Sequence, residues 1–179
     1  MKSGMPSHPL ASTPLASAPL AVRALRPERA EQVRDLLNAA AAADGAPPLS
    51  EAFVLGLEPG SGAGHLLVYA AAQLVGYAQL TDPDDHDTAA EIVVHPEHRR
   101  EGIGTTLLAA MPTGVRVWAH GSSEAGTAFA QARGLTPVRD LQLLSLDLGD
   151  ELPPVDLPEG LVVRRFRPGV DDQAWVAVN

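Results

Sequence analysis

The 179-residue sequence predicts a mixed α/β fold in which strands and helices alternate. Two observations carry this prediction. Ile92–Val94 is a run of β-branched residues, typical of a buried strand, and it stops at Pro96, which cannot donate to a strand ladder. After a short polar turn, apolar residues recur at helical spacing from Ile103 to Met111. The chain is therefore expected to contain a strand, a tight loop and a helix that begins near Gly102.

The remaining elements follow from capping residues, turn residues and apolar spacing. Pro27 suits the first position of a helix, and Gly45 suits the residue just after its end. Ser50 is expected to cap a second, short helix. The predicted order is a strand at 20–25, helices at 27–44 and 50–57, a hairpin of 65–71 and 74–80, the central strand and helix, a strand at 115–119, a helix at 123–133, and one or two strands within 138–148.

Composition narrows the classes of function. The net charge is −9, from 13 basic and 22 acidic residues, so no nucleic-acid or membrane partner is expected, because both require a basic face. The sequence contains no cysteine, which removes thiolate metal sites and a cysteine nucleophile and suits the cytoplasm. Residues 1–19 are rich in Ala, Pro and Ser and are expected to form a disordered leader, since the prolines interrupt the apolar segment of a secretion signal.

The loop between the central strand and helix suits an anion. A helix start exposes unpaired backbone N–H groups and about half a positive charge. Gly102 and Gly104 would let an anion approach that backbone, and Arg99 and Arg100 add two cations beside it. The interpretation is a phosphate or pyrophosphate site; the alternative is an ordinary turn whose glycines only pack. A dinucleotide fingerprint is excluded because Leu107 stands where its third glycine would be, and no Lys-Ser/Thr pair follows as in a phosphate-binding loop.

The spacing Arg-x-x-Gly-x-Gly directly after Val-His-Pro resembles the acyl-CoA signature of the GNAT acetyltransferases. This resemblance implies a mixed, mostly antiparallel central sheet flanked by helices, with acetyl-CoA as the acetyl donor. It also implies that the backbone of Ile92, Val93 and Val94 lines the pantetheine arm. The residues implied to hold the pyrophosphate are Arg100, Glu101, Gly102, Ile103, Gly104 and Thr105.

A second copy of the first strand lies near the end of the chain. Leu161–Pro168 repeats the pattern of Leu20–Pro27 at an offset of 161 − 20 = 141 residues. The proline- and acid-rich residues 149–160 between them are typical of a linker. We therefore expect a GNAT domain over 20–148 and the start of a truncated second GNAT domain over 161–179.

Tandem domains narrow the resemblance to the mycothiol synthases of actinobacteria, on the motifs Ala-Glu-Ile-Val-Val-His-Pro, Arg-Arg-Glu-Gly-Ile-Gly-Thr, Trp-Ala-His-Gly and Val-Val-Arg-Arg-Phe. The resemblance covers residues 20–179. It implies acetylation of the cysteinyl amine of a cysteinyl-glucosaminyl-inositol, and a second GNAT domain in the full-length protein. It also implies that Glu51 contacts the substrate, whose ammonium a carboxylate can pair with; the alternative is a first-turn helix acid favoured by the helix dipole.

Acetyl transfer requires a base for the amine and an acid for the leaving thiolate. Glu91, just before the central strand, is the candidate base; the alternative is a solvated acid at a strand start. His95 and His120 lie at strand ends, where catalytic groups often lie, and turn-capping is the favoured interpretation for each. The acid in most of the resembled family is a tyrosine, and Ala130 stands at its position. The resemblance also implies that the C-terminal half does the chemistry, so a catalytically silent, acetyl-CoA-binding support domain remains the alternative function.

The acidic run at 82–87 is expected to be a solvated loop. A divalent cation is the minority interpretation, because adjacent carboxylates without a fixed scaffold make a poor ligand set. No metal site is predicted.

Overall fold

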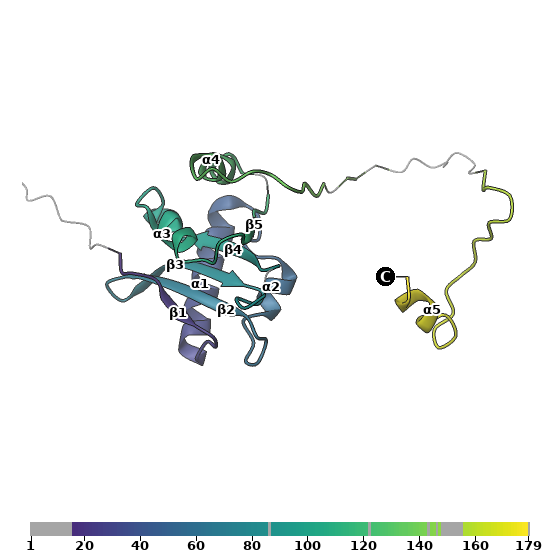
Figure 1. The fold of residues 1–179 in the computed structure, drawn as a ribbon, viewed down its shortest axis with the longest axis horizontal. Coiled ribbons are helices and arrows are strands. Elements are labelled where there is room, and N and C mark those ends of the chain that lie inside the picture. The colour runs from purple at the N-terminus through teal and green to yellow at the C-terminus, as the bar shows by residue number, and fades with distance from the viewer. Residues whose placement is uncertain are drawn as a thin grey trace, which may run out of the picture. The chain divides into compact units, whose positions relative to one another are not determined.

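The computed structural model describes residues 16–85, 87–121, 123–142, 144–145, 147 and 156–178. The chain divides into two compact units, residues 1–137 and 138–179. The first unit contains the whole of the sheet and the helices that cover it (Figure 1). The second contains one short helix, α5 (Asp172–Val176).

The sheet has five strands in the order β1-β2-β3-β4-β5. Neighbouring strands are antiparallel except for β4 and β5, which are parallel. The predicted mixed, mostly antiparallel sheet is therefore confirmed. The strand bounds are β1 Leu20–Val22, β2 Gly64–Ala70, β3 Gln73–Leu80, β4 Ala89–Val94 and β5 Arg116–Trp118.

Helices cover both faces of the sheet. The helix α1 (Pro27–Asp44) and the short α2 (Glu51–Leu55) pack on one face, and α3 (Ile103–Ala109) packs on the other (Figure 1). A 3₁₀ turn, η1 (Pro96–His98), separates β4 from α3, and α4 (Glu124–Ala132) follows β5. Two apolar clusters result, one on each side of the sheet.

Helix α1 begins and ends at the residues that the sequence predicts. Pro27 is its first residue, and Gly45 ends it in a left-handed conformation with φ of 69°, where its N–H donates to the Ala41 carbonyl at 2.9 Å. Val33 and Leu36 are fully or almost fully buried against the sheet. Burial of this face, more than helix propensity, holds the helix in place.

A buried polar chain crosses β2 and β3 on the α1 face. His65 Nδ1 lies 2.7 Å from the Tyr77 hydroxyl, which donates to Gln79 Oε1 at 2.8 Å. Burial raises the pKa of Tyr77 and lowers the pKa of His65, so both side chains are neutral near pH 7. Each of the three polar side chains therefore has a hydrogen-bond partner, as buried polar groups require.

The prediction of a strand within 138–148 is wrong for the residues that the structure describes there. None of residues 138–142, 144, 145 and 147 belongs to a strand. Val138, Leu141 and Leu144 are 78%, 65% and 84% exposed. A strand needs a neighbour that accepts its backbone hydrogen bonds and covers its apolar face, and the sheet ends at β5. Leu161–Val163 likewise forms no strand.

The predicted leader and linker are only partly described. Residues 1–15 and 149–155 lie outside the described part of the chain. Ser17, at the end of the predicted leader, donates its backbone N–H to the Tyr69 carbonyl at 2.7 Å, and its hydroxyl accepts the Tyr69 N–H at 3.1 Å. Residues 156–158 have no regular structure.

Candidate active site

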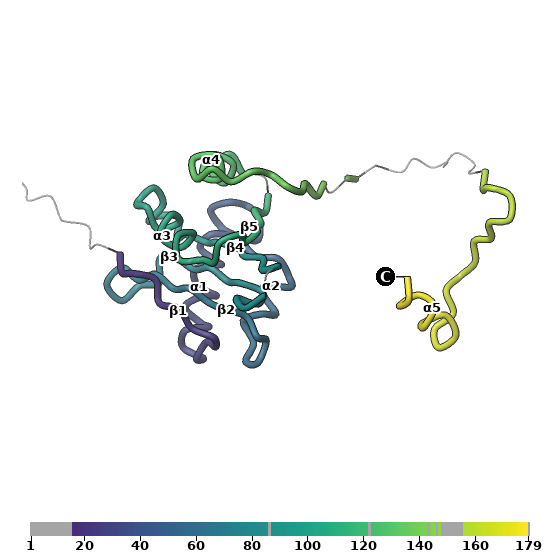
Figure 2. The backbone as a smooth tube through the Cα atoms, viewed as in Figure 1, coloured from purple at the N-terminus to yellow at the C-terminus, as the bar shows by residue number. Residues whose placement is uncertain are grey.

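The segment from β4 to α3 forms a compact strand-turn-helix unit whose path can be followed in Figure 2. His95 starts the 3₁₀ turn η1, and its Nδ1 accepts the Glu97 N–H at 3.3 Å. The expected turn-capping role of His95 is confirmed. The helix α3 begins after Gly102, close to the predicted start.

The two arginines of the loop have different environments. Arg99 donates from both terminal nitrogens to the Asp44 carboxylate at 2.7 Å, and its Nε donates to the Val94 carbonyl at 3.3 Å. The Arg99 guanidinium lowers the pKa of Asp44. Arg99 thus ties the loop to the end of α1, and its charge is already paired. Arg100 is exposed and remains a cation beside the loop.

The loop backbone is shaped by left-handed residues. Gly102 has φ of 85° and Arg100 has φ of 69°, a conformation that costs a non-glycine residue about 1–2 kcal/mol. A Cβ on Gly102 would have open space, whereas a Cβ on Gly104 would lie 3.3 Å from the Phe129 ring of α4. Gly102 therefore allows the left-handed turn before α3, and Gly104 leaves room for the Phe129 ring where α3 packs against α4.

The amide groups of residues 100–105 have no acceptor within the described part of the chain. The first three amides of α3, those of Ile103, Gly104 and Thr105, have no intrahelical acceptor by helix geometry. Glu101 also lies in the loop, and its carboxylate is 3.1 Å from His98 Nδ1. The loop therefore offers several backbone donors and one unpaired arginine to an anion.

The outer edge of β4 is only half covered. β5 pairs with Ala89–Glu91 and stops there. His95 donates its N–H to the Val75 carbonyl of β3, and because backbone groups alternate along a strand, those of Ile92 and Val94 point away from β3 toward the uncovered side. The Val93 backbone faces β3 and its side chain is 3% exposed. Of the three residues expected to line the pantetheine arm, only Ile92 and Val94 direct backbone groups to this edge, and the Val94 carbonyl there already accepts a hydrogen bond from Arg99 Nε.

Glu91 is buried beneath the α1–α2 connection. Its side chain is 2% exposed, Oε2 accepts the Ser50 N–H at 2.9 Å, and Oε1 lies 2.8 Å from His120 Nε2. The alternative of a solvated acid is wrong, because the sheet and the α2 start enclose the carboxylate. The turn-capping interpretation of His120 is also wrong, because its ring contacts Glu91. The β4–β5 register explains the contact: Glu91 pairs with Trp118, and His120 follows two residues later.

An open pocket of about 490 Å³ lies above this pair. The exposed Glu51 at the start of α2 and His120 both contribute to its wall, so the structure brings Glu51, Glu91 and His120 into one region. The contacts of the Ser50 N–H and of His120 with Glu91 were not predicted, because the first depends on how the start of α2 packs over β4 and the second on the β4–β5 register. The pocket is lined by Ala46, Pro47, Leu49, Ser50, Glu51, Val54, His120 and Gly121.

The tyrosines lie elsewhere. The Tyr69 hydroxyl donates to Gln32 Oε1 at 2.9 Å, and Tyr77 is fully buried in the polar chain described above. Ala130 lies within α4 as expected. Neither tyrosine lines the pocket.

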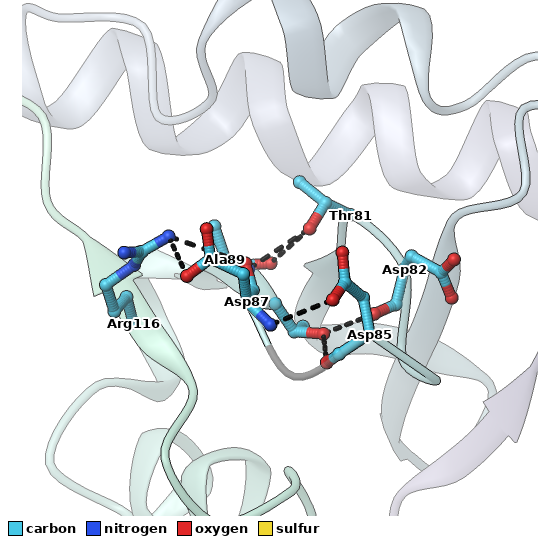
Figure 3. A network of polar contacts seen from close by, with 7 residues as sticks. Thr81, Asp82, Asp85, Asp87, Ala89 and Arg116 are labelled. Carbon is cyan, nitrogen blue, oxygen red and sulfur yellow. Dashed lines mark hydrogen bonds and ion pairs between the residues drawn. The ribbon is translucent and has the colours of Figure 1, made fainter.

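The acidic loop after β3 is held by internal contacts (Figure 3). The Thr88 hydroxyl donates to the carbonyls of Asp82 and Asp85, and the Asp87 carboxylate pairs with Arg116 at 2.6 Å. Within the described residues, which leave out His86, no group of three or more His, Asp or Glu side chains could hold a metal ion. Nor does any helix in that part of the chain combine the length and apolar character needed to cross a membrane.

Comparison with known proteins identifies relatives of the chain. A family model described as an acetyltransferase (GNAT) domain matches residues 62–135. The mycothiol acetyltransferase of Streptomyces avermitilis is 48% identical over 164 residues, which cover 87% of this chain and 53% of that protein. The one from Thermobispora bispora is 44% identical over 155 residues, with coverage of 83% and 52%. The chain thus spans about half the length of the curated relatives it matches.

Solved structures agree on the fold. A GCN5-related N-acetyltransferase from Sphaerobacter thermophilus has a TM-score of 0.57 and 27% identity, and the match covers 90% of this chain and 57% of that one. A GNAT-family acetyltransferase from Staphylococcus aureus has a TM-score of 0.54 at 16% identity. The resemblances expected from the loop and strand motifs are confirmed by these relatives.

Proposed function

The chain contains a GNAT acetyltransferase domain, and from this premise we propose that it binds acetyl-CoA and transfers the acetyl group to a primary amine of a small molecule. The observation that carries the proposal is the open outer edge of β4. It joins the amide-bearing loop at one end to the Glu91–His120 pair and the pocket at the other. A single extended ligand with an anion at one end and a reactive group at the other fits this arrangement.

The loop would hold the pyrophosphate. Backbone N–H groups of Arg100 to Thr105 are free to donate, and the exposed Arg100 supplies a charge. Gly102 leaves space beside its Cα for a phosphate oxygen. Arg99 would act indirectly, because its pairing with Asp44 fixes the loop.

The open edge would take the pantetheine arm. Its amide groups can pair with the Ile92 backbone and the Val94 N–H as an added strand would, while Val93 supports the strand from within the core. Strand residues are spaced by about 3.3 Å, so three residues carry the arm roughly 10 Å from the loop toward Glu91. The thioester would then lie beside the last β4–β5 pair, next to the pocket.

The acceptor amine would enter the pocket. Glu51 carries a carboxylate at its wall, which can pair with an ammonium group. Because the curated relatives are mycothiol acetyltransferases, we take the acceptor to be the cysteinyl amine of the mycothiol precursor, a cysteinyl-glucosaminyl-inositol. We also take the whole protein to carry a second GNAT domain, since the match covers 87% of this chain but only 53% of that relative.

A second function is favoured by one observation. Ala130 stands where the family's acid is usually a tyrosine, and neither Tyr69 nor Tyr77 lines the pocket. The domain would then bind acetyl-CoA and support a catalytic partner domain. Release of CoA separates the two functions, because only the first produces a free thiol from acetyl-CoA and the cysteinyl conjugate.

The test compares Arg100→Gly with wild type by calorimetry with acetyl-CoA. Loss of the cation should weaken binding roughly tenfold, while relief of the left-handed backbone should raise the free energy of unfolding by about 0.5–1 kcal/mol. Arg139→Gly removes an exposed arginine from the second unit and serves as the control for net charge. Equal affinities in all three proteins would contradict a cofactor role for the loop.

A further inference from the structure

We propose that Arg99 is a positioning residue that couples the anion-binding loop to the pocket. By holding Asp44 at the end of α1, Arg99 sets the position of residues 45–50 (the connector), four of which line the pocket. CoA bound at the loop therefore strengthens the binding of an amine in the pocket. This inference rests on the two ligands proposed above, and it requires no acetyl transfer by this domain.

The connector is anchored in the core at its α2 end. Leu49 is 4% exposed and belongs to the apolar cluster between α1 and the sheet. The Ser50 N–H donates to the buried Glu91 carboxylate at 2.9 Å. Neither anchor involves the loop between β4 and α3, so this end of the connector is held whether or not the loop carries a ligand.

The other end of the connector is held by Arg99. Its two terminal nitrogens each lie 2.7 Å from a different oxygen of the Asp44 carboxylate, a paired geometry that gives arginine–carboxylate contacts their directional specificity. Asp44 is the last residue of α1, and Gly45 follows it directly. A shift of Arg99 therefore moves the start of the connector relative to its anchored end.

Two prolines transmit such a shift to the pocket. Pro47 and Pro48 have fixed φ angles, and each favours extended backbone for the residue before it. The stiff connector thus passes movement at Asp44 on to Ala46 and Pro47, which line the pocket. Ala46 also lies against the turn after β5, where a Cβ on Gly121 would be 3.3 Å from its side chain. The shape of this pocket wall therefore depends on the contact between Asp44 and Arg99.

The loop beside Arg99 has a backbone conformation that an anion favours. Arg100 has φ of 69°, which is unfavourable for a residue with a Cβ, and the amides of residues 100–105 have no acceptor within the described part of the chain. A diphosphate that accepts these N–H groups offsets the backbone strain and selects the conformation that presents Arg99 to Asp44. Arg99 stays on Asp44, because its three donor nitrogens are used there and on the Val94 carbonyl.

The experiment uses the 179-residue chain with CoA, which has no acetyl group to transfer, and the cysteinyl-glucosaminyl-inositol conjugate. Calorimetry gives the Kd of the conjugate with and without saturating CoA, and CoA should lower this Kd about fivefold or more. Amide hydrogen exchange at Gly45, whose N–H donates to the Ala41 carbonyl, reports opening at the end of α1. CoA should slow this exchange by a similar factor.

Asp44→Ala and Arg99→Ala should each remove both effects of CoA. Asp35→Ala removes an exposed carboxylate from the same helix and should retain both effects. The two aspartate variants place alanine in α1, so neither lowers its helix propensity. In Asp44→Ala the freed Arg99 can contact the diphosphate, so the readout is the effect of CoA on the pocket and not the affinity for CoA. A purely structural ion pair would change exchange at Gly45 by the same factor with and without CoA.

The outcomes separate this coupling from the proposed function. Effects of CoA in Asp44→Ala equal to those in wild type would overturn the role of Arg99. Weaker binding of the conjugate in the presence of CoA would also overturn it, since the diphosphate would then be taking Arg99 from Asp44. A wild-type chain that binds CoA without any change at Gly45 or in the Kd of the conjugate would overturn the coupling alone. A chain that does not bind CoA would overturn the proposed function together with it.

Discussion

Leu20–Pro27 and Leu161–Pro168 share an apolar and basic pattern that ends in proline, yet only the first segment contains a strand. In β1, Leu20 pairs with Leu67 and Val22 pairs with His65. The second segment has no such neighbour, and its Val162 and Val163 are 82% and 73% exposed. The comparison shows that pattern alone does not make a strand. An adjacent strand must supply backbone partners and apolar cover.

The helices that follow the two segments differ in the same way. The helix α1 spans 18 residues and buries Val33 and Leu36 against the sheet, whereas α5 spans five residues and buries none. Isolated helices shorter than about 12–15 residues are marginal in water. The first copy is thus stabilised by its sheet, and the second depends on local contacts such as those between Phe166 and Trp175.

The largest expected difference concerns independent folding. A chain of residues 1–137 should unfold in one cooperative transition with the midpoint of the full chain, because the sheet and both apolar clusters lie within it. A peptide of residues 138–179 should show no cooperative transition. Thermal unfolding followed by circular dichroism measures both. A sharp transition in the peptide would refute the comparison.

Core substitutions at repeat-related positions should differ strongly in their effect. Leu25 and Phe166 occupy the same place in the two copies and are 7% and 49% exposed. Leu25→Ala should lower the free energy of unfolding of the full chain by about 2–4 kcal/mol, since it leaves a cavity. Phe166→Ala should change it by less than about 0.5 kcal/mol. Urea unfolding gives both values, and similar losses in the two variants would mean that the second unit stabilises the first.

Much of the first unit was predictable because its signals are local. Pro27 and Gly45 bound α1 where expected, and the hairpin, the central strand and the helix after Gly102 all formed. The motif around Gly102 also predicted the family. These features depend on backbone preferences and on spacing within one element.

The parts that were missed depend on tertiary structure. The pairing of Arg99 with Asp44 joins residues 55 positions apart, and the Glu91–His120 contact follows from the parallel β4–β5 register. The failed strand within 138–148 has the opposite cause: its apolar residues have good strand propensity but no neighbour in the sheet. Propensity is a weak prior where packing decides.

The smallest expected effect compares one ion pair from each unit. Arg99 lowers the pKa of Asp44 chiefly through hydrogen bonds, and Arg164 and the Arg167 N–H lower the pKa of Asp171. A carboxyl whose folded pKa is lowered stabilises the fold above its unfolded pKa of about 3.9, and this stabilisation is lost as pH falls through the folded pKa. Because Asp44 and Arg99 are each about one-third exposed, screening limits the effect to about 1 kcal/mol or less.

Arg99→Ala should therefore destabilise the cooperative transition at pH 7 by about that amount, and most of the difference from wild type should vanish at a pH low enough to protonate Asp44 in the folded state, below its lowered pKa. Arg164→Ala is the matched control, since its partner Asp171 lies seven residues away in the second unit, and it should leave this transition unchanged at both pH values. Urea unfolding at the two pH values measures each difference. An undiminished loss in Arg99→Ala at low pH would assign the stabilisation to the Val94 carbonyl contact and the packing of the arginine stem, in place of the charge pair.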